Sequence, residues 1–378
     1  MKRERLKKCI YKTIVMITIL VSGAQLFSAQ PVAAKPNDHE IKTVLNDLYK
    51  DRAEAIISQD LQKVSKYYLD EKSSRIALQH EQNRMEYLNR WSNKRAIKLT
   101  HSQSNIRIIR ESISEDHALI SLVQSHKIGY IYINKILPEQ FFGVGTRHVI
   151  TLKKRNGLWK VYKEWYLDPL DENPNKIPEG WNGLAPMVKP PSSDFIAGKK
   201  YNRDRAVHYA NKYAGAAWGA GNKHRYNNKY MDYTNKGGDC TNFASQAIGD
   251  AEEGGGLPVA GGWRYFENSG GTRTWVQTDS LSNFLIRSGY GQLVAKGDYL
   301  QITSPSDKYP EGAISRLKPG DLIGYILHDN DTDHFSVLVG YDDYGYPLVN
   351  SHTADRYRVP FDLGWDRDTK YQLFHIKD

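Results

Sequence analysis

One of the two cysteines in this chain of 378 residues stands where a nucleophile would be expected. Gly237 and Gly238 interrupt the preceding structure, and apolar side chains from Cys240 to Ile248 recur at the spacing of a helix that packs on a core. Cys240 is therefore expected at a helix N-terminus, where the helix dipole favours the thiolate, the reactive form of cysteine. The alternative is that Cys240 is a small buried apolar residue.

A thiolate nucleophile needs a base, and the base needs a group that orients it. His334 opens an apolar strand predicted over residues 334–341, and Asn350 ends the strand that returns after a turn at residues 342–345. Because the turn lies midway between them, we expect His334 and Asn350 at the same end of adjacent strands. The side-chain oxygen of Asn350 could then accept a hydrogen bond from the ring of His334.

Other residues close to these three could bind substrate or replace the base. Asp239 is expected to cap the helix of Cys240, and the alternative is that it anchors a substrate amine. The oxyanion of an acyl-transfer reaction is expected to accept from the backbone N–H of Cys240 and from one donor in the preceding loop, for which Tyr233 and Asn235 are candidates. His352 is an alternative base beyond the strand end.

No cofactor or metal is expected. The segment 328–334 is rich in His and Asp, but it lacks the glycine and the acidic twelfth residue of a calcium loop. It also lacks a third well-spaced nitrogen or sulfur ligand for zinc, so we interpret it as a solvated acidic loop. His375 is interpreted as structural. Four aromatic residues are interpreted as core or loop packing, with a substrate wall as the alternative: Trp263, Tyr265, Phe266 and Trp275.

Four short motifs together resemble one family. They are Tyr201-Asn202-Arg203, the run Gly-Asp-Cys-Thr-Asn-Phe-Ala-Ser-Gln over residues 238–246, Pro-Gly-Asp-Leu over 319–322 and Asp-His-Phe-Ser over 333–336. This part of the chain, roughly residues 199–378, resembles the putative amidase domain family, which is similar to the NlpC/P60 and CHAP cell-wall hydrolases.

The resemblance implies a papain-like fold and a secreted cysteine amidohydrolase. Cys240 would be the nucleophile, His334 the general base and acid, and Asn350 the orienting residue. The bond cleaved would be an amide or isopeptide bond, in peptidoglycan or another peptide substrate. The alternative is a non-catalytic module with a papain-like shell that binds the cell wall.

The N-terminus has the features of a signal peptide. Basic residues precede an apolar run over residues 14–21, and small residues at 32–34 predict cleavage after Ala34. An uncleaved anchor is the alternative, but the apolar run is short for a membrane span. We therefore expect a secreted or wall-associated protein with no stable membrane insertion after cleavage. Residues 1–34 carry a net charge of +5 out of +9, so the remaining charge of about +4 gives little support to nucleic-acid binding.

The mature chain is predicted to be an α+β protein with two domains. Residues 38–168 show helices over 39–58 and 74–91 and then strands, including a hairpin around Asn156-Gly157, which resembles the cone-like α+β domains called NTF2-like. We find no paired carboxylates or His cluster with catalytic spacing there. A Pro-rich linker is predicted over 169–198. The papain-like domain over 199–378 is predicted to have helices first and then an antiparallel sheet, with strands at 322–327, 334–341, 346–350 and 371–376.

Overall fold

The computed structural model describes residues 36–170, 172–180, 201–218, 226–327, 330–353 and 355–377. The described elements belong to one unit, which comprises residues 37–378. The predicted leader, and residues 171 and 181–198 of the predicted linker, lie outside the described residues. Within the described part, no helix has the length and apolar character that a membrane span requires.

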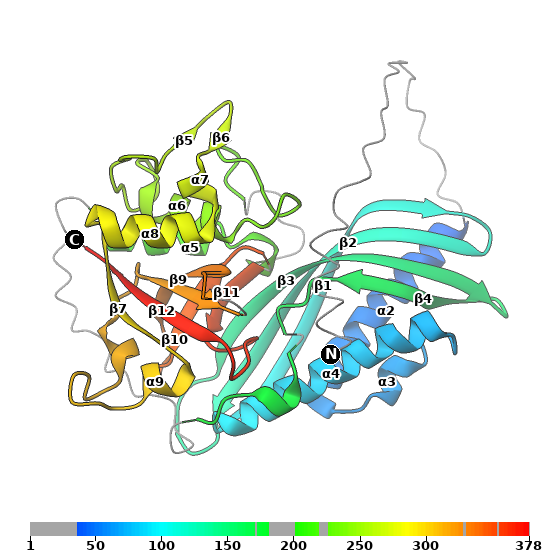
Figure 1. The fold of residues 1–378 in the computed structure, drawn as a ribbon. Helices are drawn as coiled ribbons and strands as arrows, with labels where there is room; N and C mark the ends of the chain where they lie inside the picture. The colour runs from blue at the N-terminus through cyan, green and yellow to red at the C-terminus, as the bar shows by residue number, and fades with distance from the viewer. Residues whose placement is uncertain are drawn as a thin grey trace. The chain divides into compact units, whose positions relative to one another are not determined.

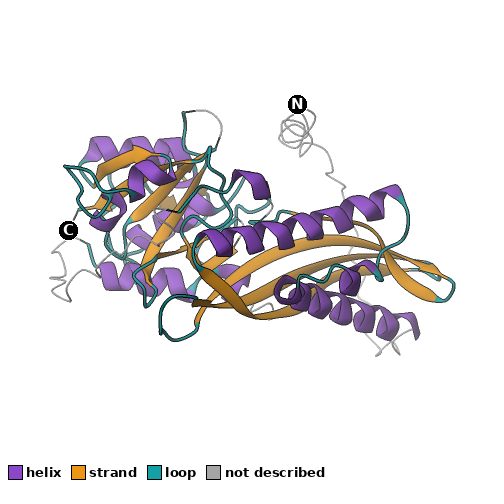
Figure 2. Ribbon diagram, turned by 90° about the horizontal axis from the view of Figure 1, so that it is seen from below, coloured by secondary structure: helices purple, strands orange, loops and turns teal. Residues whose placement is uncertain are grey.

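In the described part of the chain, three helices and four long strands come first (Figure 1): α2 (Pro36–Ser58), α3 (Gln62–Ser65), α4 (Lys72–Lys94), β1 (Ile97–Ile113), β2 (His117–Tyr132), β3 (Gln140–Arg155) and β4 (Leu158–Tyr166). Figure 2 shows the long strands as curved ribbons with the helices packed along them. Ile41, Leu45 and Leu48 of α2 are fully buried, as the predicted apolar stripe requires. Asn156 and Gly157 both have positive φ, 51° and 78°, which a two-residue hairpin turn demands.

The C-terminal part begins with helices and ends with strands. Its elements are α5 (Arg203–Lys212), η3 (Gly215–Trp218), α6 (Cys240–Gly249), β5 (Tyr265–Phe266), β6 (Gly270–Gly271), α7 (Arg273–Val276), α8 (Thr278–Ser288), β7 (Gly291–Gly297), α9 (Tyr299–Thr303), η4 (Ala313–Arg316), β8 (Leu322–Ile326), β9 (His334–Tyr341), β10 (Pro347–Ser351), β11 (Asp355–Pro360) and β12 (Lys370–Ile376). The predicted order of helices before an antiparallel sheet is therefore present.

One antiparallel sheet of ten strands runs through both parts of the unit. Its order is β1-β2-β3-β11-β10-β9-β8-β12-β7, with β4 beside β3. The two parts meet where β11 pairs with β3, with Asp355 opposite Gly145. A Cβ at Gly145 would lie 2.5 Å from the carbonyl carbon of Ala216, so a larger residue would collide with η3 where it crosses β3.

In the C-terminal part, the two faces of this sheet pack into different hydrophobic clusters. Phe335 and Val337 of β9 belong to a cluster with the apolar residues of α5 and α6, including Phe243. Leu338 of the same strand belongs to the larger cluster, which continues into α2 and α4. Since successive residues of a strand point to opposite faces, α6 lies on the face that bears Phe335.

Part of the predicted linker is ordered and packed. Pro174–Lys176 form a short 3₁₀ helix, η1, and the Lys94 ammonium donates to the Ile177 carbonyl at 3.0 Å. The Arg367 backbone N–H donates to the Lys176 carbonyl at 2.6 Å. This segment therefore makes contacts with both parts of the unit, and the division into domains at 169–198 stays a prediction.

The fold class is confirmed at the coarse level of a mixed α+β protein with a large antiparallel sheet. The papain-like description of the C-terminal part stays a prediction. Four strands of the C-terminal part were not predicted: the two-residue strands β5 and β6, and the longer strands β7 and β11. The apolar run of β7 is short, Leu293-Val294-Ala295 between Gln292 and Lys296, and β11 alternates Arg356 and Arg358 with Tyr357 and Val359.

Candidate functional site

Cys240 is the first residue of α6, as predicted, and its side chain is buried. Gly237 and Gly238 precede it with φ of 104° and 123°, a conformation that glycine adopts most easily. The residue is 7% exposed, and its sulfur lies 3.8 Å from the hydroxyl of Thr241. The backbone N–H groups of Phe335 and Thr241 also face the sulfur. The sulfur of Cys240 therefore lies where the start of α6 meets the start of β9.

The expectation of a thiolate at rest is wrong in this structure. Burial raises the pKa of the Cys240 thiol, and the nearby Asp239 carboxylate raises it further. The N–H groups of Phe335 and Thr241 act in the opposite direction without cancelling the effect of burial. The helix dipole alone does not decide the charge, because a buried thiolate loses its hydration.

His334 opens β9 as predicted, and its ring lies among aromatic side chains. It pairs with Tyr325 of β8, and its ring centre is 5.6 Å from that of Tyr325 and 5.4 Å from that of Trp365. Burial and the Arg356 guanidinium lower the pKa of His334 to about 3. Its Nε2 is buried and has no hydrogen-bond partner among the described residues. The ring is thus neutral and unpartnered at that nitrogen, and it makes no hydrogen bond with the sulfur of Cys240.

The expected pairing of Asn350 with His334 is wrong. Asn350 lies opposite Val337 in the β9–β10 ladder, because the hairpin pairs Pro347 with Tyr341 and the following residues of β10 therefore do not reach His334. Its side-chain nitrogen donates to the Ala210 carbonyl at 2.9 Å and to the Asn211 side chain at 3.0 Å, and its oxygen accepts from the Arg358 backbone N–H at 2.6 Å. Asn350 therefore joins α5, β10 and β11, and both of its side-chain polar atoms have partners other than His334.

Asp239 stands at the N-cap position of α6, but its side chain does not cap the helix. One carboxylate oxygen accepts from the Tyr233 backbone N–H at 2.9 Å and from the Asn242 side chain at 2.8 Å. The other lies 2.5 Å from Nδ1 of His352. The backbone N–H of Asp239 donates to the Thr353 hydroxyl at 2.6 Å. The capping prediction is therefore wrong, because the carboxylate is used to join α6 to the preceding loop and to the end of β10.

His352, predicted as an alternative base, is also held on both sides. Its Nε2 lies 2.6 Å from the Tyr213 carbonyl oxygen, and its ring stacks on Phe243 with centres 4.1 Å apart. Burial acts to lower the pKa of His352, but the Asp239 carboxylate outweighs it and the pKa is raised overall. A ring whose two nitrogens both have partners offers no free lone pair to a thiol.

The two predicted oxyanion donors lie in the loop before α6. The backbone N–H of Tyr233 is used by Asp239, and its hydroxyl accepts from the Gly271 N–H at 3.0 Å. Asn235 is exposed in a turn. The backbone N–H of Cys240 has no hydrogen-bond partner in the described part of the chain, so it stays available to an oxyanion.

The other singled-out residues take structural places. His375 lies 3.0 Å from the Asp321 carboxylate, and Trp263 stacks on Trp275 with centres 4.9 Å apart in the core, as expected. Phe266 is 49% exposed. His328 and Asp329 of the acidic segment lie outside the described residues. Among the residues that are described, no group of three His, Cys, Asp or Glu side chains could hold a metal.

A buried acid–base cluster in the N-terminal part was missed by the sequence analysis. Glu164 of β4 accepts from Arg52 at 3.0 Å, from the Tyr49 hydroxyl at 3.0 Å and lies 2.8 Å from His148. Burial acts to raise the pKa of Glu164, but Arg52 and His148 lower it overall. Arg52 also pairs with Glu81 at 3.7 Å. The sequence does contain a signal for this cluster. Each long helix has a charged residue within its apolar face: Arg52 in α2 and Glu81 in α4.

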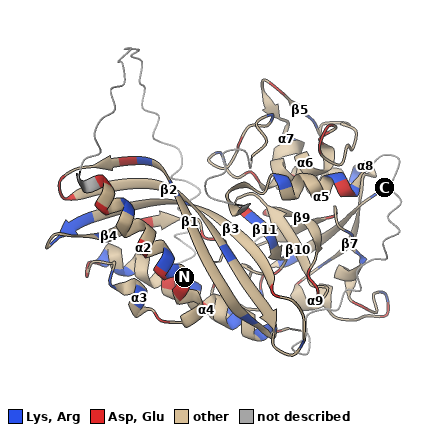
Figure 3. Ribbon diagram, turned by 180° about the vertical axis from the view of Figure 1, so that it is seen from behind, with Lys and Arg blue, Asp and Glu red and all other residues tan. Residues whose placement is uncertain are grey.

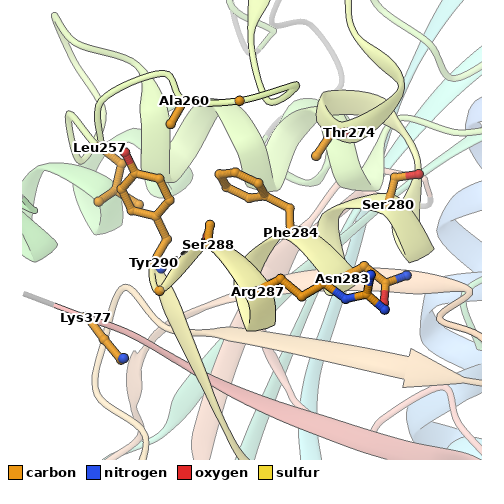
Figure 4. Close-up of a pocket in the computed structure, with 12 residues that line it drawn as sticks. Leu257, Ala260, Thr274, Ser280, Asn283, Phe284, Arg287, Ser288, Tyr290 and Lys377 are labelled. Carbon is orange, nitrogen blue, oxygen red and sulfur yellow. Dashed lines mark hydrogen bonds between the residues drawn. The ribbon is translucent and has the colours of Figure 1, made fainter.

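A separate pocket of about 820 Å³ lies beside α8 (Figure 4). It is lined by Leu257, Ala260, Gly261, Thr274, Ser280, Asn283, Phe284, Arg287, Ser288, Gly289, Tyr290 and Lys377. None of these residues was predicted as a site residue, and the pocket does not include Cys240. It therefore gives no support to the candidate site.

Acidic and basic residues alternate with one another along the N-terminal helices, where the ribbon is coloured by residue type (Figure 3). Several form surface ion pairs, such as Lys66 with Asp51 at 2.7 Å and Lys154 with Glu40 at 2.8 Å. The expectation that the protein does not bind nucleic acid stays a prediction.

Comparison with known proteins finds a match to a family model and matches to several solved structures. A family model described as "Putative amidase domain" matches residues 200–375, a segment that contains all the predicted site residues. No curated protein matches the chain.

Solved structures with some similarity include NTF2-like proteins. A "putative dehydratase" of the NTF2-like family from Streptomyces avermitilis is 11% identical, with 34% of this chain and 94% of that chain covered and a TM-score of 0.27. A hexachlorocyclohexane dehydrochlorinase, LinA type 2, is 14% identical, with 34% and 89% covered and a TM-score of 0.24. An NTF2-like protein of unknown function from Shewanella oneidensis MR-1 is 13% identical, with 35% and 100% covered and a TM-score of 0.21.

Proposed function

We propose that residues 199–378 hydrolyse an amide bond with Cys240 as the nucleophile and His334 as general base and acid. The family match over residues 200–375 supports amide hydrolysis. The single observation that supports Cys240 in this role is its place at the start of α6, with its own N–H unpartnered and two further N–H groups directed at the sulfur. The unpartnered N–H can stabilise the oxyanion that develops during acyl transfer, and the two N–H groups at the sulfur can stabilise negative charge on the thiol.

The proposed reaction starts from a neutral thiol and a neutral imidazole. The sulfur attacks the amide carbon while its proton passes to His334, and a tetrahedral oxyanion forms that accepts from the N–H of Cys240. The imidazolium then protonates the leaving amine, the C–N bond breaks and a thioester remains. Water, with His334 again as base, hydrolyses the thioester to a carboxylic acid and restores the thiol.

This mechanism requires the His334 ring to reach the sulfur when substrate binds. The unpartnered Nε2 supports a ring that is free to reorient, because a buried ring nitrogen without a partner gains from meeting one. His334 is the first residue of β9 and lies next to Phe335, whose N–H already faces the sulfur. A change of side-chain rotamer at the strand start is the movement we propose.

We further propose that the protein is exported and acts on peptidoglycan. The support is the sequence of residues 1–34, with its basic and apolar regions and its small residues at 32–34, together with the resemblance to cell-wall hydrolases. A wall substrate offers many amide bonds in its stem peptides, and this class of bonds is the substrate we propose.

Incubation with defined muropeptides tests the proposed function. The full chain and the Cys240→Ala variant are each incubated with muropeptides, and the products are identified by mass. We expect a mass gain of one water across an amide bond with the wild-type protein and no product with Cys240→Ala. Products that form equally with both proteins would contradict the role of Cys240.

The alternative function is a non-catalytic module that binds the cell wall. The observation that favours it is that Cys240 is buried with a raised pKa, while His334 is neutral and not bonded to it. Co-sedimentation with purified peptidoglycan separates the two functions. Equal binding by the wild type and by Cys240→Ala, with no product from either, would favour the module.

A further inference from the structure

The ring of His352 is held between the side chain of Asp239 and a backbone carbonyl group. Nδ1 lies 2.5 Å from a carboxylate oxygen of Asp239, and Nε2 lies 2.6 Å from the backbone carbonyl oxygen of Tyr213. A carbonyl oxygen has no proton to donate, so Nε2 must carry one. The charge of the ring therefore depends on whether Nδ1 also carries a proton.

The contacts of Asp239 place that proton on the ring. Its other oxygen already accepts two N–H groups, from Tyr233 at 2.9 Å and from Asn242 at 2.8 Å. Two N–H donors stabilise the ionised carboxylate, which then acts as the acceptor for Nδ1. With both nitrogens donating, the ring is an imidazolium.

The surroundings of His352 favour a cation. The ring is 1% exposed, and it stacks on Phe243 and lies 4.4 Å from the ring of Tyr226. The charged groups that act on it are Asp239 at the start of α6 and Asp355 of β11. Asp355 is itself paired with Arg147 at 3.4 Å and accepts from the Tyr226 hydroxyl. Two carboxylates thus act on the ring, and one of them is paired with a guanidinium, which leaves room for one compensating positive charge.

We infer that His352 is a buried imidazolium that fixes the peptide between Asp239 and Cys240, and that it acts as a positioning residue for the proposed nucleophile. It joins the end of β10 to the start of α6, where Thr353 adds a second link to the backbone of Asp239 at 2.6 Å. The part of this inference that concerns catalysis rests on the proposed function, whereas the charge of the ring does not.

Loss of the proton would break this connection. A neutral ring would direct a lone pair at either the carboxylate of Asp239 or the carbonyl of Tyr213, and one of the two contacts would become repulsive. The start of α6 would then open more often, and the buried sulfur would become accessible to reagents that reach it only in the open state.

Nuclear magnetic resonance of the ring nitrogens tests the charge directly. In the full chain labelled with ¹⁵N-histidine, we expect one ring with two protonated nitrogens that persists at pH 7.5, above the usual pKa of histidine of about 6.5. The His352→Gln variant should lose this signal. If that variant does not fold, contacts of the ring protons to Phe243 and Tyr226 make the assignment. A ring of His352 with a single protonated nitrogen at pH 6 would overturn the inference.

Alkylation of Cys240 tests the positioning role without any turnover. Labelling by iodoacetamide at pH 7.5, followed at Cys240 by peptide mass mapping, should be on the order of tenfold faster in His352→Gln than in the wild type. His375→Gln is the matched control, because it removes another His–Asp contact of the same part of the chain, and it should change the rate by less than about twofold. Equal rates in His352→Gln and the wild type would overturn the positioning role. Since neither measurement depends on amide hydrolysis, failure of the proposed function would not be mistaken for failure of this inference.

Discussion

Burial decides the protonation of the two residues proposed to do the chemistry. Cys240 and His334 are 7% and 6% exposed, and burial raises the pKa of the thiol and lowers that of the imidazole. Both groups therefore start uncharged, and the proton must leave the sulfur as the new bond forms. Substrate binding that brings ring and sulfur together would supply the interaction that each lacks at rest.

The lowered pKa of His334 predicts a dependence of stability on acid. Its folded pKa of about 3 lies below the unfolded value of about 6.5, so the unfolded chain binds more protons between these two values. Stability is therefore complete above pH 6.5 and falls as the pH drops toward 3. At pH 5 the expected loss from this group is about 2 kcal/mol.

Urea denaturation at pH 7.5 and pH 5 checks this prediction. The drop in the free energy of unfolding between the two pH values should be smaller in His334→Gln by about 2 kcal/mol, because glutamine does not titrate. His126 and His148 are also buried with lowered pKa values, so part of the drop should remain in the variant. An identical drop in the two proteins would show that His334 already titrates normally.

At the scale of elements, the close crossing of η3 over β3 depends on glycine. A Cβ at Gly145 would lie 2.5 Å from the carbonyl carbon of Ala216 and 2.5 Å from the nitrogen of Ala217. These are backbone atoms, which cannot rotate away. Gly145 also pairs with Asp355 where β3 meets β11.

We therefore expect Gly145→Ala to destabilise the protein by about 1–3 kcal/mol, through overpacking between η3 and β3. The free energy of unfolding in urea measures this loss. Gly262→Ala is the control, because a Cβ there would meet only the Thr274 hydroxyl, at 3.5 Å, and should cost less than about 1 kcal/mol. A Gly145→Ala variant as stable as Gly262→Ala would show that η3 does not pack this closely.

At the scale of the whole described unit, a buried carboxylate connects the N-terminal helices to the C-terminal strands. Asp362, after β11, accepts from the Trp91 ring nitrogen at 3.0 Å, from Arg95 at 2.6 Å and from the Tyr346 hydroxyl at 2.6 Å. Arg95 and Asp362 are fully buried. Because this network and the pairing of β3 with β11 both join the two parts, we expect the two parts to unfold together.

Replacement of Asp362 by Asn should cost about 3–5 kcal/mol, because it leaves the Arg95 guanidinium buried without its counter-ion. Urea unfolding followed by tryptophan fluorescence and by circular dichroism measures the cost, and the two probes should report one coincident transition. Glu86→Gln is the control. It breaks an exposed ion pair with Arg90 within α4, and it should cost less than about 1 kcal/mol. Two separated transitions in the wild type would contradict the coupling of the two parts.

The sequence alone determined the elements whose pattern is local. The long helices α2 and α4, the Asn156-Gly157 hairpin, β9 and the start of α6 at Cys240 follow from periodicity and turn residues within a few positions of one another. The sequence did not reveal β11, because its alternating Arg and Tyr residues become a strand only when β3 and β10 lie on either side of it.

Tertiary structure also decided what the site residues contact. Asn350 was predicted to face His334, but the β9–β10 hairpin pairs Pro347 with Tyr341, so Asn350 lies opposite Val337 and bonds to α5. The carboxylate of Asp239 is met by His352, 113 positions away. The charge state of Cys240 likewise depends on burial by β9, which overrides the local effect of the helix start. Hydrogen bonds and desolvation act through space between distant residues, whereas propensity and periodicity act along the chain, so the sequence could place the sulfur but not its environment.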